Sequence, residues 1–441
     1  MNPRTTNILQ VLLSTLLALS YFAAQDARAQ ELTDGQVFLI STRLAEGAQR
    51  SWELGARAQA ALELNATRYS VYSKAGLPPP QRVPSDMALG LEPVFNIARR
   101  VLDQRPGGSD PRPLISDSSS ADPASLGIAV VLANWTNLDN NADRYASAAT
   151  SQAEYLFSTQ VPKSDTGAIS HRGAEVQIWS DSTFMVPPFL AYYGVITRNQ
   201  DIVREAFNQV RLYRDHLRDG DTGLWKHSVL GNNSDPGLWA TGNGWAAAGM
   251  LRVFATIEHS EYKDGLGSEL NELKNWVNEI HRGVYDRFFD GENLVHNYLN
   301  DDRTFRDAAA TALIASTVYR ASTLYDEHRY IPQAQRSRLT LFTPNGGPGS
   351  NSDGSRFNDY EYFTTDGWLR PVSNPASVGD ALDNGRSPEA QAFAVMLHAA
   401  WKDWVFEGEK GKDGASSALG LRVGAAGAWA LAVLAGIAVL V

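Results

Sequence analysis

Apolar residues recur with the period of an α-helix along most of this chain. In the stretches SELNELKNWVNEI and EAQAFAVMLHAAWKDWV they fall at positions i, i+3, i+4 and i+7, which share one face of a helix. The alternating pattern of a half-buried strand is almost absent. The periodicity predicts helices at residues 35–64, 87–102, 125–135, 142–157, 182–196, 202–217, 244–257, 270–289, 307–322, 331–342 and 388–406.

Long connections rich in glycine and tryptophan separate several of these helices. They span residues 160–178, 219–242, 289–306 and 343–387, and loops of this length in a compact domain usually carry function or lack order. The stretch PNGGPGSNSDGS in the last loop has the composition of a flexible, turn-rich surface segment. Because no linker interrupts residues 30–408, we expect one all-α domain, a closed barrel of helical hairpins whose long loops build a cleft at one end.

The first residues have the three parts of a secretory signal peptide. Arg4 supplies the positive charge, residues 8–24 form the apolar stretch, and the A-R-A sequence before Gln30 provides the small residues of a cleavage site. A transmembrane anchor is the alternative, but the apolar stretch is short for one. We therefore expect residues 1–29 to be removed and the protein to be extracellular.

The C-terminal residues, 409–441, have the pattern of a spacer and a glycosylphosphatidylinositol (GPI) attachment signal. Small residues at 414–417 precede a spacer with one charge, Arg422, and an apolar stretch then reaches the last residue. A C-terminal membrane helix is the alternative, but nothing polar follows the apolar stretch. We expect a GPI anchor to hold the protein at the plasma membrane or cell wall as its one link to a membrane. Such an anchor implies a eukaryotic source.

Charge and cysteine content restrict the expected partners. The formal net charge is −10, and removal of both terminal signals makes it more negative, so nucleic acid is not an expected partner. With no cysteine, the domain relies on its core alone, although it travels an oxidising route. The N-x-S/T pattern makes Asn65, Asn134 and Asn232 candidate glycosylation sites of a secreted glycoprotein.

One carboxylate stands in unusually apolar surroundings. Asp181 lies beside Trp179 in the stretch QIWSDSTFMVPPFLAYYG, and a charge among so many apolar side chains is costly unless it is paired, hydrogen-bonded or used. Such surroundings raise the pKa of a carboxyl, as a general acid working near neutral pH requires. The alternative is that Asp181 caps a helix beginning at Ser182, which is a common role of aspartate.

Other polar and aromatic residues concentrate in and beside the long loops. Tryptophan is a natural platform for carbohydrate because an indole face stacks on the apolar face of a sugar ring. A tryptophan on a helix, such as Trp245 or Trp401, more simply fills the barrel. The candidates for substrate contact are His171, Arg172, Trp179, Trp225, His227, Trp239, Thr241, Asn243 and Arg370.

Three segments together resemble a known group of enzymes. QIWSDSTFMVPPFLAYYG, GLWKH and WATGNGW look like segments of the unsaturated glucuronyl and rhamnogalacturonyl hydrolases, which are glycoside hydrolase families 88 and 105. The likeness extends from about Asp122 through Pro388, and the W-x-D-x-x-F/Y-M-x-x-P-F pattern is its most specific part. The resemblance implies an (α/α)6 barrel of six helical hairpins and an oligosaccharide substrate.

The resemblance also implies a reaction. These enzymes act on oligosaccharides left by polysaccharide lyases, for example from pectin, whose terminal uronate carries a C4=C5 double bond. By resemblance, Asp181 protonates C4, and the same carboxylate then helps a water attack C5, so that a hemiketal forms, opens and releases the remaining sugar. Because this is hydration rather than displacement at C1, the carboxylate spacing of ordinary glycosidases does not apply. One acid/base with a tuned pKa is enough.

A second aspartate early in the barrel is typical of the family. Asp122 matches it best and is the second catalytic candidate, while Asp117 is the neighbouring alternative and Asp122 can instead cap the helix that follows it. The other matched positions are His227, which hydrogen-bonds substrate in the family, and Trp179 and Trp239, which fit sugar-contacting positions. Arg172, beside His171, can replace a basic residue at the family's cleft edge.

Thr241 departs from the family pattern. Relatives commonly read W-x-R-G-N-G-W, whereas this chain has Thr241 at the arginine position. A threonine cannot replace the planar, multi-donor anion clamp of a guanidinium, so the preference for uronate comes into question. Our hypothesis is that Arg172 or Arg370 supplies the missing charge from another loop.

No motif indicates a metal site or another cofactor. The adjacent Asp301 and Asp302 resemble the paired aspartates of fungal mannan-processing barrels in glycoside hydrolase family 76, although a solvated loop explains them as well. A family 76-like hydrolase is therefore the alternative enzyme. A wall protein that binds carbohydrate without catalysis is the alternative of a different class, and Thr241 favours it. We expect a monomer.

Overall fold

The computed structural model of the protein describes residues 32–345 and 354–413. The expected signal peptide and residues 414–441 of the expected GPI signal lie outside the described residues, as does most of the turn-rich segment around residue 350. The described part of the chain contains twelve α-helices, α2 to α13. None of these helices is long and apolar enough to cross a membrane.

Six helices form a closed inner ring. Each packs against the next, and the last packs against the first, which closes the barrel. A short 3-10 helix, η2 (Asp122–Leu126), precedes α5 and fills the space between α3 and α7. Helices of this ring are buried on nearly every side, which explains why their sequences are apolar all round rather than on one face. The inner helices are α3 (Ser51–Asn65), α5 (Gly127–Trp135), α7 (Ser182–Ile196), α9 (Ala240–Glu258), α11 (Ala308–Tyr325) and α13 (Pro388–Phe406).

Six amphipathic helices surround this ring. Each covers one or two inner helices with its apolar face and exposes its polar face, as the helical periodicity predicts. The outer helices are α2 (Asp34–Gly47), α4 (Ser85–Gln104), α6 (Ala142–Phe157), α8 (Gln200–Leu217), α10 (Gly267–Arg287) and α12 (Ile331–Phe342). The predicted all-α fold of the (α/α)6 type is therefore confirmed.

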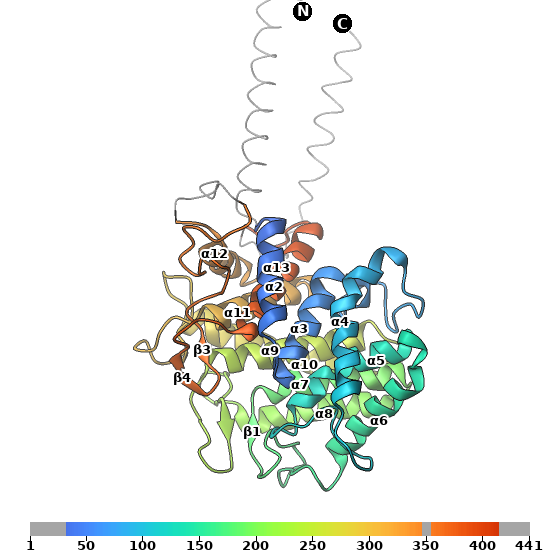
Figure 1. The fold of residues 1–441 in the computed structure, drawn as a ribbon. Helices are drawn as coiled ribbons and strands as arrows, with labels where there is room; N and C mark the ends of the chain where they lie inside the picture. The colour runs from blue at the N-terminus through green and yellow to red at the C-terminus, as the bar shows by residue number, and fades with distance from the viewer. Residues whose placement is uncertain (1–31, 346–353, 414–441) are drawn as a thin grey trace, which may run out of the picture.

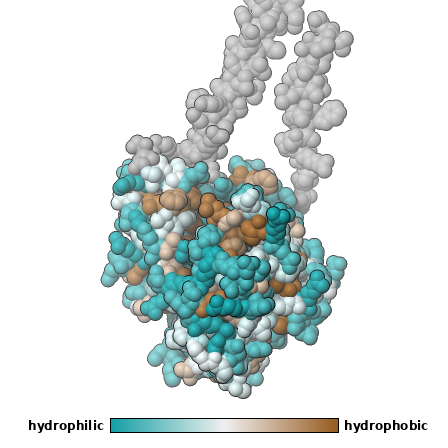
Figure 2. Space-filling view, turned by 45° about the vertical axis from the view of Figure 1, so that its right-hand side comes forward, coloured by the Kyte–Doolittle hydropathy of each residue, from teal (hydrophilic) through white to brown (hydrophobic). Residues whose placement is uncertain are grey.

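The surface reflects this two-layer architecture. The face turned forward in Figure 2 is largely hydrophilic, with small hydrophobic patches toward its upper half. Two short antiparallel pairs of strands lie beside the helices: β1 (Ile178–Trp179) pairs with β2 (Ser228–Val229), and β3 (Ser373–Asn374) pairs with β4 (Ser377–Ala381). Figure 1 shows these strands toward the lower and left edges of the barrel.

The predicted helix at residues 35–64 is in fact two helices. The chain is extended at Ala48 and Arg50, and the carboxylate of Glu53 accepts hydrogen bonds of 2.8 Å from the N–H groups of Gln49 and Arg50. These bonds fix the start of α3 in the manner of a capping box. The break turns the chain from the outer layer into the inner ring and brings the first turn of α3 to the cavity described below.

Candidate active site

One end of the barrel holds a cavity of about 330 Å³. The first turns of α3, η2, α7, α9 and α13 reach it, so the N-terminal ends of several inner helices point toward the same space. Helix N-termini carry partial positive charge, which favours an anionic ligand. The cavity is lined by Arg50, Trp52, Glu53, Asp117, Ser118, Ser119, Asp122, His171, Arg172, Trp179, Asp181, Met185, His227, Trp239, Trp245, Pro375, Ala376, Val378 and Glu389.

Asp181 stands directly before α7 and faces this cavity. Its side chain makes no capping hydrogen bond to the helix, so the capping role considered from sequence is wrong. Instead, its Oδ2 accepts a hydrogen bond of 3.1 Å from the Ser180 hydroxyl and lies 3.9 Å from Nε2 of His227. Burial raises the pKa of Asp181, although a positive charge on the nearby His227, in its doubly protonated form, opposes this shift.

Asp122 is the second carboxyl at the cavity. It begins η2, its side chain caps neither η2 nor α5, and its Oδ1 lies 3.7 Å from Nε2 of His171. Burial holds its pKa well above the ordinary value, and the negative charges of Asp117 and Asp181 add to this effect. Asp117 also lines the cavity, but its carboxylate is engaged by the Ser51 hydroxyl and, at 3.0 Å, by the N–H of Ser119.

Aromatic rings form one wall of the cavity. The rings of His171 and Trp179 stack with centroids 4.3 Å apart, and the ring of His227 meets both Trp179, at 4.8 Å, and Trp239, at 4.7 Å. The guanidinium of Arg172 lies 4.6 Å from the centroid of Trp179. These rings come together because β1 pairs with β2 and the N–H of Ser180 donates to the carbonyl of His227 at 2.9 Å.

Trp225, Thr241, Asn243 and Arg370 do not line the cavity, which corrects the expectation that they contact substrate. Trp225 and Thr241 are buried in the barrel, and Arg370 is exposed outside the cavity. The side-chain amide of Asn243 instead binds the backbone. It accepts from the N–H of Trp225 at 2.8 Å and donates to the carbonyls of Trp225 and Trp239, both at 2.9 Å. Asn243 therefore fastens the loop before α9 to that helix.

Glu389, Trp52 and Arg50 also line the cavity, although none of them is predicted as a site residue from sequence. Glu389, in the first turn of α13, accepts a hydrogen bond of 3.0 Å from the indole N–H of Trp52. Burial raises the pKa of Glu389 to about 8, and the negative charge of Asp181 adds to the shift. The only local signal, an acidic residue in a first helical turn, is common at helix starts and does not indicate a site.

The charges of the cavity are unusual in combination. Asp122, Asp181 and Glu389 all have raised pKa values, while Arg50 and Arg172 carry positive charge in the same wall. The cavity therefore combines carboxyl groups whose protonated forms are favoured by burial with cations that attract an anion. Within the described ranges, no three metal-binding side chains are grouped so that they could hold a metal ion.

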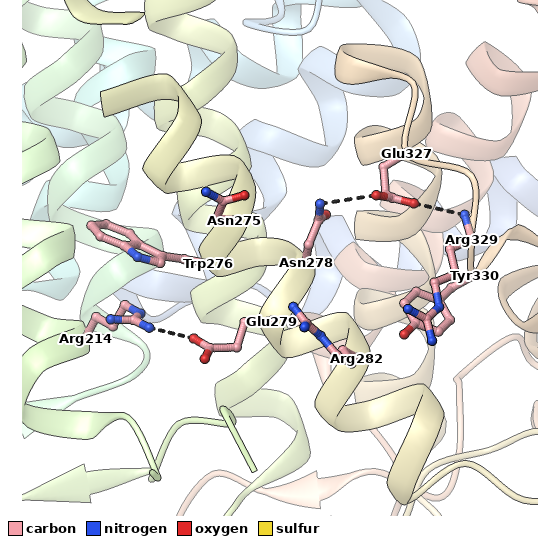
Figure 3. A pocket seen from close by; sticks show the side chains of 9 residues that line it. All are labelled: Arg214, Asn275, Trp276, Asn278, Glu279, Arg282, Glu327, Arg329 and Tyr330. Carbon is pink, nitrogen blue, oxygen red and sulfur yellow. Dashed lines mark hydrogen bonds and ion pairs between the residues drawn. The ribbon is translucent and has the colours of Figure 1, made fainter. Parts of the chain in front are cut away.

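A second hollow, of about 480 Å³, lies between outer helices α8 and α10 and the connection from α11 to α12. Figure 3 shows Arg214 pointing at Glu279 and Asn278 pointing at Glu327. The carboxylate of Glu279 is paired with Arg214 at 2.6 Å and also with Arg218, so it is held by neighbours rather than free for chemistry. This hollow shares no residue with the cavity at the helix N-termini.

The paired aspartates considered for a family 76-like enzyme also lie elsewhere. Asp301 forms a two-bond ion pair with Arg303, at 2.7 and 2.8 Å, and neither Asp301 nor Asp302 lines the cavity. Asp302 is exposed. The local pairing of Asp301 with Arg303 explains its position without a catalytic role.

Comparison with known proteins gives consistent matches. The sequence model of Glycosyl Hydrolase Family 88 matches residues 116–355. The unsaturated rhamnogalacturonyl hydrolase YesR of Bacillus subtilis (strain 168) is 27% identical over 197 residues, which are 42% of this chain and 54% of that protein. The chain thus spans about half the length of this curated relative.

Solved structures share the fold at low sequence identity. A possible member of the GH105 family from Salmonella enterica serovar Paratyphi A aligns with a TM-score of 0.60 and 16% identity over 84% of this chain and 93% of its own. The unsaturated glucuronyl hydrolase of Bacillus sp. GL1, described as responsible for the degradation of glycosaminoglycan, aligns with a TM-score of 0.53 and 15% identity over 87% and 98%.

Proposed function

Because this chain belongs to glycosyl hydrolase family 88, we propose that it releases unsaturated uronyl residues from lyase-generated oligosaccharides, such as those of rhamnogalacturonan. The observation that carries the proposal is the position of Asp181: a largely buried carboxyl with a raised pKa, in a cavity walled by indole and imidazole rings. The name of the Bacillus subtilis relative supports the rhamnogalacturonan origin of the substrate.

Asp181 acts first as an acid and then as a base. Burial raises the pKa of Asp181 and so favours its protonated form, which delivers a proton to C4 of the C4=C5 double bond. Positive charge then develops at C5 and is shared with the ring oxygen. The Asp181 carboxylate takes a proton from a water that attacks C5, which restores the acid and adds one water across the double bond. The hemiketal at C5 opens and frees the remaining sugar.

Asp122 assists as a neutral group. Its pKa lies well above the ordinary value, so its carboxyl can donate a hydrogen bond to a hydroxyl of the sugar ring without adding a negative charge beside Asp181. The indoles of Trp179 and Trp239 are fixed in the wall by bonds from their N–H groups, to Gln177 at 2.7 Å and to Asn297 at 3.0 Å, so that they offer an apolar surface beside the sugar.

Arg172 supplies the positive charge for the uronate carboxylate. It lines the cavity, whereas Arg370 does not, so only one of the two arginines considered in place of the family arginine is in reach. The stack on Trp179 holds the guanidinium at the wall. Thr241 does not remove anion recognition in this arrangement, because the charge comes from another loop.

The test follows the absorbance of the conjugated uronate in lyase-digested rhamnogalacturonan. We expect the wild type to remove this absorbance and Asp181→Asn to lower kcat by about 10³-fold, because general acid–base catalysis contributes on the order of 10²–10⁴. Asp302→Asn makes the same chemical change on an exposed loop residue and should leave kcat unchanged. Turnover that persists in Asp181→Asn would overturn the mechanism, and binding without turnover in the wild type would favour a carbohydrate-binding protein.

We also propose that the protein is exported, carries a GPI anchor and acts as a monomer. The support for export and anchoring is the sequence of residues 1–29 and 414–441. Asn65 and Asn232 are exposed, which supports glycosylation there, while Asn134 is partly buried. Release from cell membranes by phosphatidylinositol-specific phospholipase C tests the anchor, and light scattering of the released protein tests the monomer.

A further inference from the structure

His227 stands between two carboxylates. Its Nδ1 lies 3.0 Å from Oδ2 of Asp235, and its Nε2 faces Oδ2 of Asp181 at 3.9 Å. The imidazole is buried, and Nε2 has no hydrogen-bond partner among the residues that the structure describes. The ring cannot turn freely because it packs against both Trp179 and Trp239. Each ring nitrogen therefore has its own fixed neighbour.

Asp235 is held as an ionised acceptor. Burial alone would raise its pKa, but hydrogen bonds from His227, Tyr298 and the N–H of Gly237 lower the pKa of Asp235 to about 2. The Tyr298 hydroxyl donates to the same Oδ2 that faces His227, and the Gly237 N–H donates to Oδ1 at 2.9 Å. A carboxylate of this kind can only accept, so the proton of a neutral His227 must lie on Nδ1.

Hydrogen bonds of the backbone also hold the Asp235 carboxylate in place. The loop that joins His227 to Asp235 folds back on itself, because the N–H of His227 donates to the carbonyl of Gly237 at 2.8 Å. Ser228 makes two bonds to Asp235: its N–H donates to the carbonyl at 2.7 Å, and its hydroxyl accepts from the N–H at 2.8 Å. The pair is therefore built into one rigid loop.

We propose that Asp235, together with Tyr298, is a positioning residue that holds His227 in the Nδ1–H tautomer, so that Nε2 presents a lone pair to Asp181 and favours its protonated form. The inference rests on the proposed function, because it concerns the proton that Asp181 delivers to C4. Asp235 is not among the candidate site residues predicted from sequence. The other titratable or charged groups around Asp181 and His227 are Asp122, His171, Arg172 and Glu389.

The substitution Asp235→Asn reverses the tautomer. An amide can donate to Nδ1, which moves the proton of His227 to Nε2. The N–H at Nε2 then donates to Asp181 and stabilises its ionised form, so its pKa falls and the acid is lost near neutral pH. We expect kcat to fall by about 10³-fold or more, since the wrong histidine tautomer costs on the order of 10⁴ in a serine protease triad. The basic limb of the pH profile should move to lower pH, while substrate affinity changes little.

Two measurements separate this role from a structural one. Nitrogen-15 NMR of the histidine rings should show Nδ1–H for His227 in the wild type and Nε2–H in Asp235→Asn. Tyr298→Phe removes one donor to Asp235 but keeps the carboxylate, so we expect the same tautomer and a smaller fall in kcat. If Asp235→Asn does not fold, the wild-type tautomer and the pH profile of Tyr298→Phe still decide the question.

The outcomes also distinguish this inference from the proposed function. If Asp181→Asn keeps its turnover, the proposed function fails whatever Asp235→Asn does. If Asp181→Asn is inactive but Asp235→Asn keeps the wild-type kcat and pH profile, only the role of Asp235 is overturned. A wild-type His227 with its proton on Nε2 overturns it as well.

Discussion

The indole N–H of Trp52 donates a hydrogen bond of 3.0 Å to the carboxyl of Glu389. This bond joins the first turn of α3 to the first turn of α13, the two helices whose contact closes the inner ring. Both side chains line the cavity, so the closure of the barrel also builds one wall of the site. This hydrogen bond places the carboxyl of Glu389, whose pKa is raised, in the same cavity as Asp181 and Asp122.

The raised pKa of Glu389 predicts a pH-dependent effect of Glu389→Gln on stability. The pKa of this carboxyl is about 8 in the folded protein, above its value of 4.5 in an unfolded chain. An acid with a raised folded pKa contributes stability at low pH that is lost as the pH rises through the folded pKa. The variant, which stays neutral, should therefore have a higher Tm than the wild type at about pH 8 and the same Tm at about pH 4.

Calorimetry at both pH values checks this prediction. Gln can still accept the hydrogen bond from Trp52, so the comparison isolates the charge. A Tm difference that is equal at both pH values would contradict a buried, titrating Glu389.

Two substitutions of Asp122 test its assignment as a neutral hydrogen-bond donor. Asn keeps a donor of similar shape, whereas Ala removes it, so Asp122→Asn should lower kcat/KM by about tenfold or less, the range of one hydrogen bond, and Asp122→Ala should lower it further. Steady-state kinetics on an unsaturated disaccharide provide the measurement. A loss in Asp122→Asn as large as that in Asp181→Asn would mean that the Asp122 proton itself is transferred.

The helical layers could be predicted from sequence because the period of apolar residues is a local property. The start of α9 could not, since the glycines of WATGNGW are typical of a loop. In the structure both glycines lie within the helix and allow close packing. A Cβ on Gly242, before the predicted start, would overlap Oγ of Ser180, and a Cβ on Gly244 would stand 2.9 Å from Cδ2 of Leu313 on α11. The glycines of this helical segment therefore serve close packing against other parts of the chain, which local composition does not reveal.

In the site, too, local features could be predicted from sequence and long-range contacts could not. Asp181 could be singled out because two of the apolar residues that line the cavity with it, Trp179 and Met185, are its neighbours in sequence. Glu389 could not, because its surroundings come from Trp52 and Asp181, which are far away along the chain. Asn243 is predicted to contact substrate together with the other polar residues of the long loops, but its amide is used by the backbone of Trp225. Local composition marks an unusual residue, whereas the direction of its side chain depends on the closed ring.

Arg172 and Arg370 should differ in their effect on specificity. A hydrogen bond to a charged group contributes about 1.5–3 kcal/mol, so Arg172→Ala should lower kcat/KM for the unsaturated uronate by about 10- to 100-fold. The methyl ester of the same substrate has no charge and should be affected much less. Arg370→Ala, at an exposed position outside the cavity, is the matched control and should leave both values unchanged. An equal loss on acid and ester in Arg172→Ala would show that Arg172 supports the wall rather than recognising charge.

Substitution of Asn243 should lower the free energy of unfolding. The residue is fully buried, and its removal leaves the N–H and the carbonyl of Trp225 without their amide partner. Buried polar groups without partners cost about 1–3 kcal/mol each, so Asn243→Ala should lower the free energy of unfolding by about 3 kcal/mol. Urea unfolding measures this change, and Asn275→Ala, at an exposed position of α10 (Figure 3), should change it by less than about 0.5 kcal/mol.

The same substitution separates positioning from folding. His227 follows Trp225 by two residues, so a loop released from α9 should move the imidazole away from Asp181 even while the barrel stays folded. We therefore expect Asn243→Ala to lower kcat even at temperatures well below the unfolding temperature of the variant. A displacement of about 1 Å at a catalytic group can cost on the order of 10²-fold in rate. Full activity per folded molecule, together with the expected loss of stability, would mean that the other contacts of His227 hold it without Asn243, and that the amide of Asn243 serves only the core.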